Sequence, residues 1–136
     1  MRYRYLACLF AALALPSAIA TASTVRETVN VNFSHELPNV PGKKLMAVEV
    51  VYPPGAASLP HHHAGSAFIY AYVVSGGIVS EVDGGGEKTY TAGQSFYEAP
   101  GSHHQVSRNV STTEPAKLLA VFVVDGTDTH LTTPDK

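Results

Sequence analysis

Residues 55–63 read GAASLPHHH and residues 98–104 read EAPGSHH, so five of the seven histidines lie in two short clusters. Side chains two residues apart in an extended segment point to the same face. His61 and His63 are therefore expected to converge on one point, while His62 faces away. Imidazole and carboxylate groups suit a divalent transition metal such as Fe, Mn, Zn, Ni or Cu, and the second cluster offers both types. The two clusters together predict a metal site.

Short apolar runs rich in Val, Tyr, Phe and Thr surround both clusters, and Gly, Pro, Asn and Asp separate these runs. This composition is typical of β-strands, and the segments SGG at 75–77 and DGGG at 83–86 supply the positive-φ residues that hairpin turns need. No long window after the N-terminal segment has a helical period. We expect an all-β sandwich or barrel with strands at 25–33, 44–52, 68–74, 78–82, 88–91, 95–98, 104–109 and 118–124.

The two clusters also carry two motifs in a fixed order. The first consists of Gly55, His61 and His63, with YVVSG downstream at 72–76, and the second consists of Gly93, APG at 99–101 and His104. This order and spacing resemble the motifs of the cupins, which are small β-barrels that hold a metal inside, over roughly residues 44–124. The resemblance implies a single cupin β-barrel of the double-stranded β-helix, jelly-roll type at residues 24–125. It also implies that His61, His63 and His104 bind the metal.

The sequence departs from the cupin pattern at one metal ligand. The first motif normally adds a glutamate soon after its second histidine, but residues 64–69 read AGSAFI. Glu98 is a candidate replacement, because strand alternation places it on the same face as Phe96, a plausible core residue. We therefore predict a site made of His61, His63, Glu98 and His104. The alternative is that Tyr97 faces inward and Glu98 is a solvated charge.

The remaining candidate residues lie beside these ligands. His62 and His103 should face away as solvent-exposed or supporting residues, unless a slipped register makes them alternative ligands. Arg108 lies four residues beyond His104, and we expect it on the same strand face, where it would meet an anionic substrate or remain a solvated charge. Four aromatic residues are possible pocket-lining side chains, although core packing is the simpler interpretation of each: Tyr70, Tyr72, Phe96 and Tyr97.

The N-terminal residues 1–20 are typical of a cleaved secretory signal peptide. Arg2 and Arg4 precede an apolar run of about ten residues, and small residues at Ala18 and Ala20 suit cleavage after Ala20, with Ala22 as a second choice. The run is too short to span a bilayer, so we expect a periplasmic or secreted protein with no stable membrane anchor. Cleavage removes the single cysteine and changes the net charge from -2 to -4, which excludes thiolate metal sites. The polar residues 126–136 predict a flexible C-terminal tail.

The composition and the candidate ligands also limit the function. The 9 Lys and Arg residues against 11 Asp and Glu residues predict no nucleic-acid partner. Four protein ligands leave an octahedral metal two open positions for a small, oxygen-rich chelating molecule. This arrangement favours a metal-dependent enzyme of the dioxygenase type, or an isomerase or lyase. The alternative is a non-catalytic module that binds a sugar, an organic acid or the metal itself.

A homodimer is a further possibility. The first predicted strand, at 25–33, alternates Val29, Val31 and Phe33, which makes it a candidate for pairing with a second copy of the chain. The alternative is that this strand closes its own sheet.

Overall fold

The computed structural model describes residues 25–136, so the expected signal peptide at 1–20 lies outside the described residues. Residues 25–136 form β-strands and no α-helix. No helical segment in this part of the chain is long and apolar enough to cross a bilayer. The strands are β1 (Thr28–Glu36), β2 (Lys43–Tyr52), β3 (His61–His63), β4 (Phe68–Ser75), β5 (Gly77–Val82), β6 (Lys88–Thr91), β7 (Ser95–Glu98), β8 (His103–Asn109), β9 (Ala116–Asp125) and β10 (Thr132–Pro134).

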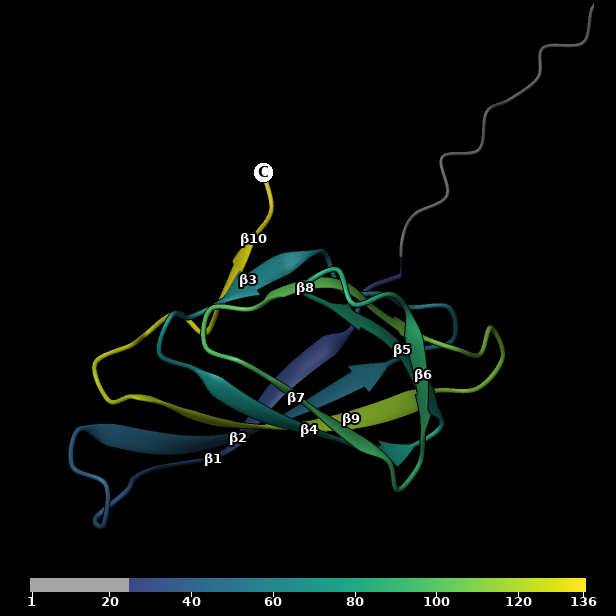
Figure 1. Cartoon of the computed structure of the whole chain (residues 1–136). Helices are drawn as coiled ribbons and strands as arrows, with labels where there is room; N and C mark the ends of the chain where they lie inside the picture. Colours follow the sequence, from purple (N-terminus) through teal and green to yellow (C-terminus); the bar gives the residue numbers. More distant parts are fainter. Residues whose placement is uncertain (1–24) are drawn as a thin grey trace, which may run out of the picture.

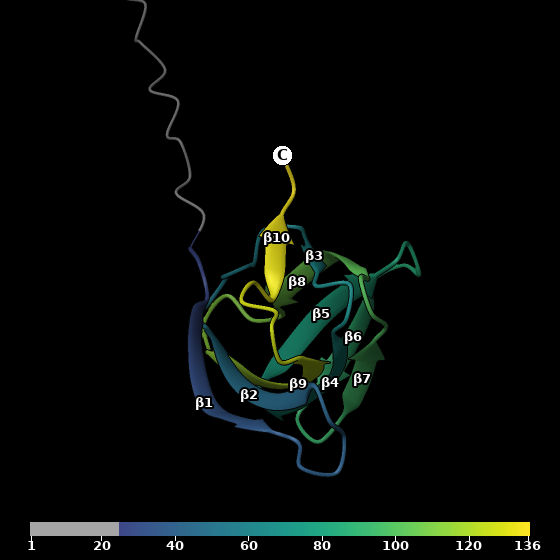
Figure 2. The same ribbon diagram turned by 90° about the vertical axis from the view of Figure 1, so that its left-hand side faces the viewer.

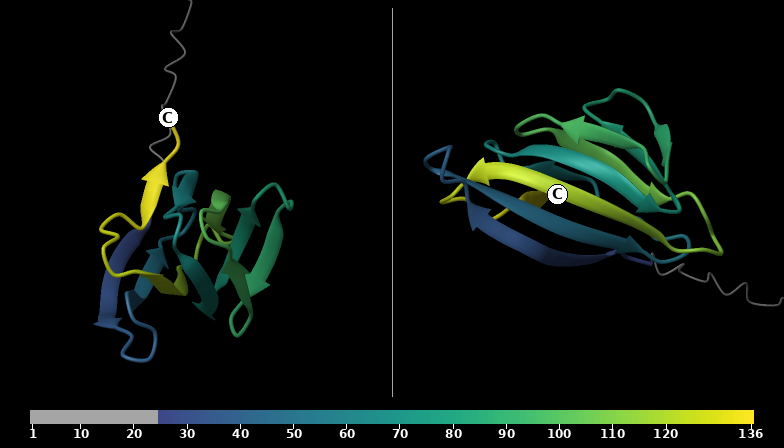
Figure 3. Two further views of the ribbon diagram at one scale, coloured as in Figure 1. Left: turned by 60° about the vertical axis from the view of Figure 1, so that its left-hand side comes forward. Right: turned by 90° about the horizontal axis from the view of Figure 1, so that it is seen from below.

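The strands form two five-stranded sheets whose paired strands are all antiparallel. One sheet has the order β1-β2-β9-β4-β7 and the other has the order β10-β3-β8-β5-β6. The sheets lie on opposite sides of the molecule, and the first is seen along its full width from below (Figures 1 and 3). This arrangement confirms the expected all-β barrel.

The core lies between the sheets and is set by the alternation of β9. In this strand every second residue from Ala116 to Val124 is buried, and the intervening residues are partly exposed. The inward side chains contribute to two apolar clusters, one around Tyr52 and Ile78 and the other around Ile69 and Phe122. Side chains of β2 and β9 also line a cavity between the two sheets.

The C-terminal segment corrects the expectation of a flexible tail at 126–136. Residues Thr132–Pro134 form β10, which pairs with β3, and Leu131 packs against the core cluster around Phe122. The preceding turn is held by Lys44, whose Nζ donates a hydrogen bond to the Asp128 carbonyl at 2.7 Å. Figure 2 shows β10 beside β3 at the edge of its sheet. The segment can be polar because backbone hydrogen bonds to β3, and not apolar side chains, hold most of it at the edge of the sheet.

Candidate metal centre

Three histidines converge inside the barrel from two neighbouring strands. His61 and His63 lie on β3, and His104 lies on β8 directly opposite His61. One ring nitrogen of each histidine lies within 4.8 Å of the corresponding nitrogens of the other two. Strand alternation therefore places His61 and His63 on the same face of β3, and the pairing of β3 with β8 adds His104.

Glu98, on β7 of the opposite sheet, contacts two of these histidines. Its Oε2 lies 2.9 Å from His63 Nε2 and 3.3 Å from His104 Nδ1, and Glu98 is only 3% exposed. The next residue toward the N-terminus, Tyr97, is 67% exposed and points outward. Of the two strand parities considered for β7, the structure has the one that turns the carboxylate inward.

The hydrogen bonds of two histidines leave the opposite nitrogen free to bind a metal. His61 Nδ1 lies 2.7 Å from the Leu59 carbonyl oxygen, which can only accept, so the proton is on Nδ1 and the Nε2 lone pair is free. His104 Nε2 lies 2.8 Å from Ser80 Oγ. A proton donated there leaves the Nδ1 lone pair facing Glu98. A tautomer fixed by a carbonyl acceptor, as in His61, is typical of metal-binding histidines.

The protonation states also suit a metal. Burial lowers the pKa of His104 to about 4, and burial lowers the pKa of His61 as well. Burial by itself would raise the pKa of Glu98, but the contacts with His63 and His104 outweigh it, so this pKa lies below its ordinary value. At neutral pH His61 and His104 are thus neutral imidazoles and Glu98 is a carboxylate, which are the forms that bind a metal.

Buried atoms without partners test whether a metal fits this site. His63 Nδ1, His63 Nε2 and Glu98 Oε2 are buried and make no hydrogen bond, because the short contact between His63 and Glu98 is not aligned for one. Unsatisfied buried polar atoms, and a buried carboxylate above all, are costly. A divalent cation between these atoms would satisfy the carboxylate and one imidazole nitrogen. The residues present therefore fit a transition metal.

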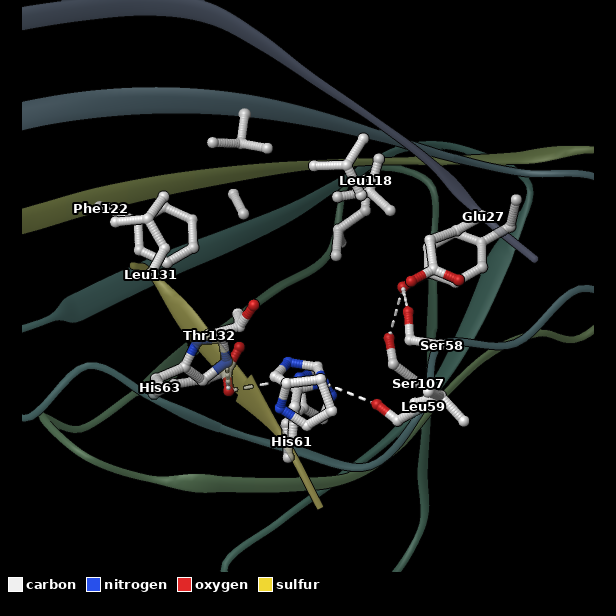
Figure 4. Close-up of a pocket in the computed structure, with 18 residues that line it drawn as sticks. Glu27, Ser58, Leu59, His61, His63, Ser107, Leu118, Phe122, Leu131 and Thr132 are labelled. Carbon is white, nitrogen blue, oxygen red and sulfur yellow. Dashed lines mark hydrogen bonds and ion pairs between the residues drawn. The ribbon is translucent and has the colours of Figure 1, made fainter. Parts of the chain in front are cut away.

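The site opens into a cavity of about 220 Å³ between the sheets. One end is polar: the Tyr52 hydroxyl makes hydrogen bonds to Ser58 Oγ at 2.9 Å and Ser107 Oγ at 2.7 Å, and the buried Glu27 Oε2 has no hydrogen-bond partner. Figure 4 shows Glu27, Ser58 and Ser107 at one end of the cavity and His63 at the other. The walls between these ends are mostly apolar and include Val48, Val50, Leu118, Ala120, Phe122 and Leu131.

No sequence motif marks these polar residues. Glu27 stands alone before the first strand, and Tyr52, Ser58 and Ser107 belong to no recognisable motif. Tyr52 lies at the end of β2 on the same face as Val48, so strand alternation would have found it. The other three reach the cavity through pairing between distant segments, which leaves no local pattern.

The aromatic residues expected to line the pocket do not line this cavity. In β4 the inward positions are Ile69, Ala71 and Val73, so Tyr70 and Tyr72 lie on the other face. Tyr97 also points outward and stacks on Phe68 outside the barrel. The physical reason is that small and aliphatic residues fill the narrow space between the sheets in β4.

Phe96 points inward, but its ring packs against Tyr90 with 4.6 Å between ring centroids. It belongs to the apolar cluster around Tyr52 and Ile78 and does not line the cavity.

Arg108 also differs from its expected position. A register shift between Glu81 and Val82 leaves Gln105 as an extra residue of β8, because Val82 pairs with His104 and Glu81 pairs with Val106. One extra residue reverses the alternation that follows. Arg108 therefore points away from the cavity and makes an ion pair with Glu87 at 2.8 Å. Ser107 takes the inward position instead.

Three comparisons with known proteins bear on this fold. The family model described as "Cupin domain" matches residues 48–122. No match was found among curated proteins.

Among solved structures, a conserved protein with a double-stranded β-helix domain from Klebsiella pneumoniae is similar at a TM-score of 0.64 and 17% identity, covering 84% of this chain and 88% of that chain. A Thermus thermophilus protein is similar at a TM-score of 0.57 and 26% identity, covering 73% and 84%. The cupin domain of an XRE family transcriptional regulator from Enterobacter cloacae is similar at a TM-score of 0.58 and 23% identity, covering 71% and 94%. Because the family model spans more than half of the chain and the fold agrees with it, this protein belongs to the cupin family.

Proposed function

We propose that this cupin is a metal-dependent enzyme of the dioxygenase type that acts on a small, oxygen-rich chelating substrate. The observation that carries the proposal is the cluster of His61, His63 and His104 at one end of a cavity, with Glu98 in contact with two of these histidines. Four ligands on one side would leave positions for substrate oxygens on the side that faces the cavity. A redox-active metal bound there would supply the electron transfer between an electron-rich substrate and dioxygen.

The chain's own residues would hold the substrate and exclude water. The apolar walls from β2 and β9, including Val50, Leu118 and Phe122, would surround the carbon skeleton of the substrate. The volume of about 220 Å³ suits a molecule smaller than a typical drug. At the far end, the hydroxyl groups of Tyr52 and Ser107 would make hydrogen bonds to a second polar group of the substrate.

A second candidate, isomerase or lyase activity, gains support from Glu27. This residue lines the cavity, and its buried Oε2 has no hydrogen-bond partner. A carboxylate in that position would accept a proton from a C–H or O–H group of the bound substrate. The metal would then act as a Lewis acid on the substrate oxygens.

Oxygen consumption separates the two candidates. We would first determine the native metal by elemental analysis, and then measure oxygen uptake and product formation with catechols, flavonols and diketones. Dioxygenase activity requires oxygen and is lost in Glu98→Gln, whereas Glu27→Gln retains it. Isomerase or lyase activity persists without oxygen and is lost in Glu27→Gln. Tight ligand binding without turnover under any of the metals would contradict both and support a non-catalytic binding module.

We also propose that the protein is exported to the periplasm or secreted after cleavage of residues 1–20. Arg2 and Arg4, the apolar run and the small residues before position 21 support this proposal. Mass spectrometry of the protein from fractionated cells should find a chain that begins at Thr21. An intact N-terminus in a cytoplasmic fraction would contradict export.

A further inference from the structure

The alternation that turns His61 and His63 into the barrel turns His62 outward, and the side chain of His103 on β8 stacks on it and is partly exposed. We propose that His62, His103 and Asp135 form a second divalent transition-metal site on the outer surface of the barrel. One ligand atom of each lies within 4.8 Å of the other two. This site is distinct from the one proposed for catalysis and does not depend on it.

Strand pairing holds the two histidines together. His62 lies directly opposite His103. In the neighbouring pair, the His63 N–H donates a hydrogen bond to the Ser102 carbonyl at 3.0 Å. Because the two kinds of antiparallel pair alternate, His62 and His103 form a non-hydrogen-bonded pair, in which opposite side chains lie closest. Their rings stack with centroids 4.2 Å apart and an angle of 10° between the planes.

The C-terminal strand supplies the carboxylate. β10 pairs with β3, and the Asp135 N–H donates a hydrogen bond to the Pro60 carbonyl at 3.0 Å. The two carboxylate oxygens face different histidines: Oδ2 lies 2.8 Å from His103 Nε2 and Oδ1 lies 3.8 Å from His62 Nε2. Two imidazoles and a carboxylate form a ligand set for Zn, Ni or Cu, with water free to complete the coordination.

The position of this site gives it a structural consequence. Two ligands lie on β3 and β8, and the third comes from the segment that follows β10. Leu131, Thr132 and Pro134 of this C-terminal segment line the inner cavity. A metal bound to His62, His103 and Asp135 would thus hold the C-terminal segment against β3 and stabilise one wall of the cavity at the inner site.

Zinc titration of the full chain, purified without a histidine tag, tests the site. In Glu98→Gln, where the inner site is impaired, isothermal titration should still detect zinc binding to the outer site. Adding His62→Gln or Asp135→Asn should abolish that event, whereas adding His130→Ala, an exposed histidine on the same C-terminal segment, should leave it unchanged. Equal zinc affinity and stoichiometry in all of these variants would overturn the proposal.

Hydrogen exchange tests the link to the C-terminal strand. If opening of β10 releases zinc, then zinc at 100 times its Kd should slow exchange at the Asp135 amide roughly 100-fold. The same zinc concentration should have no effect in His62→Gln. If zinc binds but the exchange rate of this amide does not change, the metal does not stabilise the pairing of β10 with β3. Failure of catalysis would not affect either readout.

Discussion

The carboxylate of Glu98 sets the charge of the inner metal centre. With neutral imidazoles at His61 and His104 and an ionised Glu98, a divalent cation bound there would face the negative charge of the carboxylate. The chain therefore places an anion where few water molecules can reach it. Glu98 on β7 is therefore the candidate to replace the glutamate that the first motif lacks.

Replacing Glu98 with Gln should weaken metal binding at the inner site by at least about tenfold, because the amide keeps the shape of the side chain but loses its charge. The expected sign is a smaller rise in melting temperature when zinc or manganese is added. Calorimetry at matched metal concentrations measures this rise. Glu87→Gln, which removes an exposed carboxylate paired with Arg108, is the matched control and should bind metal as the unmodified chain does. Unchanged binding in Glu98→Gln would remove Glu98 from the ligand set.

The metal-free protein should lose stability as the pH falls from about 6.5 to about 4. Burial lowers the pKa of His104 from 6.5 to about 4, so in this window the unfolded chain binds a proton that the folded chain excludes. The stability is fully present above pH 6.5, and the loss by pH 4 is of the order of 3 kcal/mol for this residue. His61 acts in the same direction.

Urea denaturation with a chelator present, at pH 7.5 and at pH 4.5, measures this loss. In His104→Asn the difference between the two pH values should shrink, because the substituted side chain does not titrate. An equal pH dependence in both proteins would show that other groups cause the loss.

Which site residues the sequence could predict depended on the regularity of each strand. Alternation placed His61 and His63 on the inner face and Glu98 with Phe96, because β3 and β7 are regular there. The same reasoning failed for Arg108, because the extra residue at Gln105 reverses the alternation of β8. A bulge is formed by the pairing of two strands, so the sequence of one strand does not reveal it.

At the scale of elements, the apolar composition predicted the long strands but not the two shortest. All eight expected runs overlap observed strands. β3 consists of three histidines and β10 reads TTP, so neither has the branched apolar residues that mark a strand. They are strands because β3 pairs with β8 and β10 pairs with β3. Such pairing is a property of the assembled sheet and leaves no pattern in the sequence of a single strand. The sequence signal for the candidate ligands His61 and His63 was thus stronger than the signal for the strand that carries them.

The turn between β4 and β5 requires glycine at one position. Gly76 has a φ of 70°, and a Cβ atom there would lie 2.8 Å from the Cβ of Ala116 and 2.9 Å from the Pro115 carbonyl oxygen. Gly76→Ala should therefore lower the free energy of unfolding by about 2–4 kcal/mol, which combines the left-handed backbone with overpacking. Urea denaturation measures the change.

Gly86→Ala is the matched control, because Gly86 has a φ of 78° but no atom within 4 Å of the added Cβ. It should cost only about 1–2 kcal/mol, the penalty of the backbone conformation alone. Equal losses in the two variants would show that contact with Ala116 does not determine the need for glycine at 76.

At the scale of the whole molecule, the two sheets leave the first strand partly uncovered. β1 lies at the edge of its sheet, and Val29 and Val31 pair with Val50 and Val48, which face the core. Even so, Val29 is 58% exposed and Val31 is 57% exposed. β1 also presents a backbone edge without a neighbouring strand among the described residues. These features are typical of a surface that a second chain covers.

We therefore propose a homodimer in which β1 of each copy covers the other. Light scattering of the full-length mature chain should give the mass of a dimer. Val31→Lys should shift it to a monomer, because a charge would then lie in the buried interface without a partner. Val74→Lys is the matched control, since Val74 is 46% exposed on β4 and lies away from the β1 edge. A monomeric unmodified chain, or a dimer that survives Val31→Lys, would exclude β1 as the contact and leave it as the free edge of its own sheet.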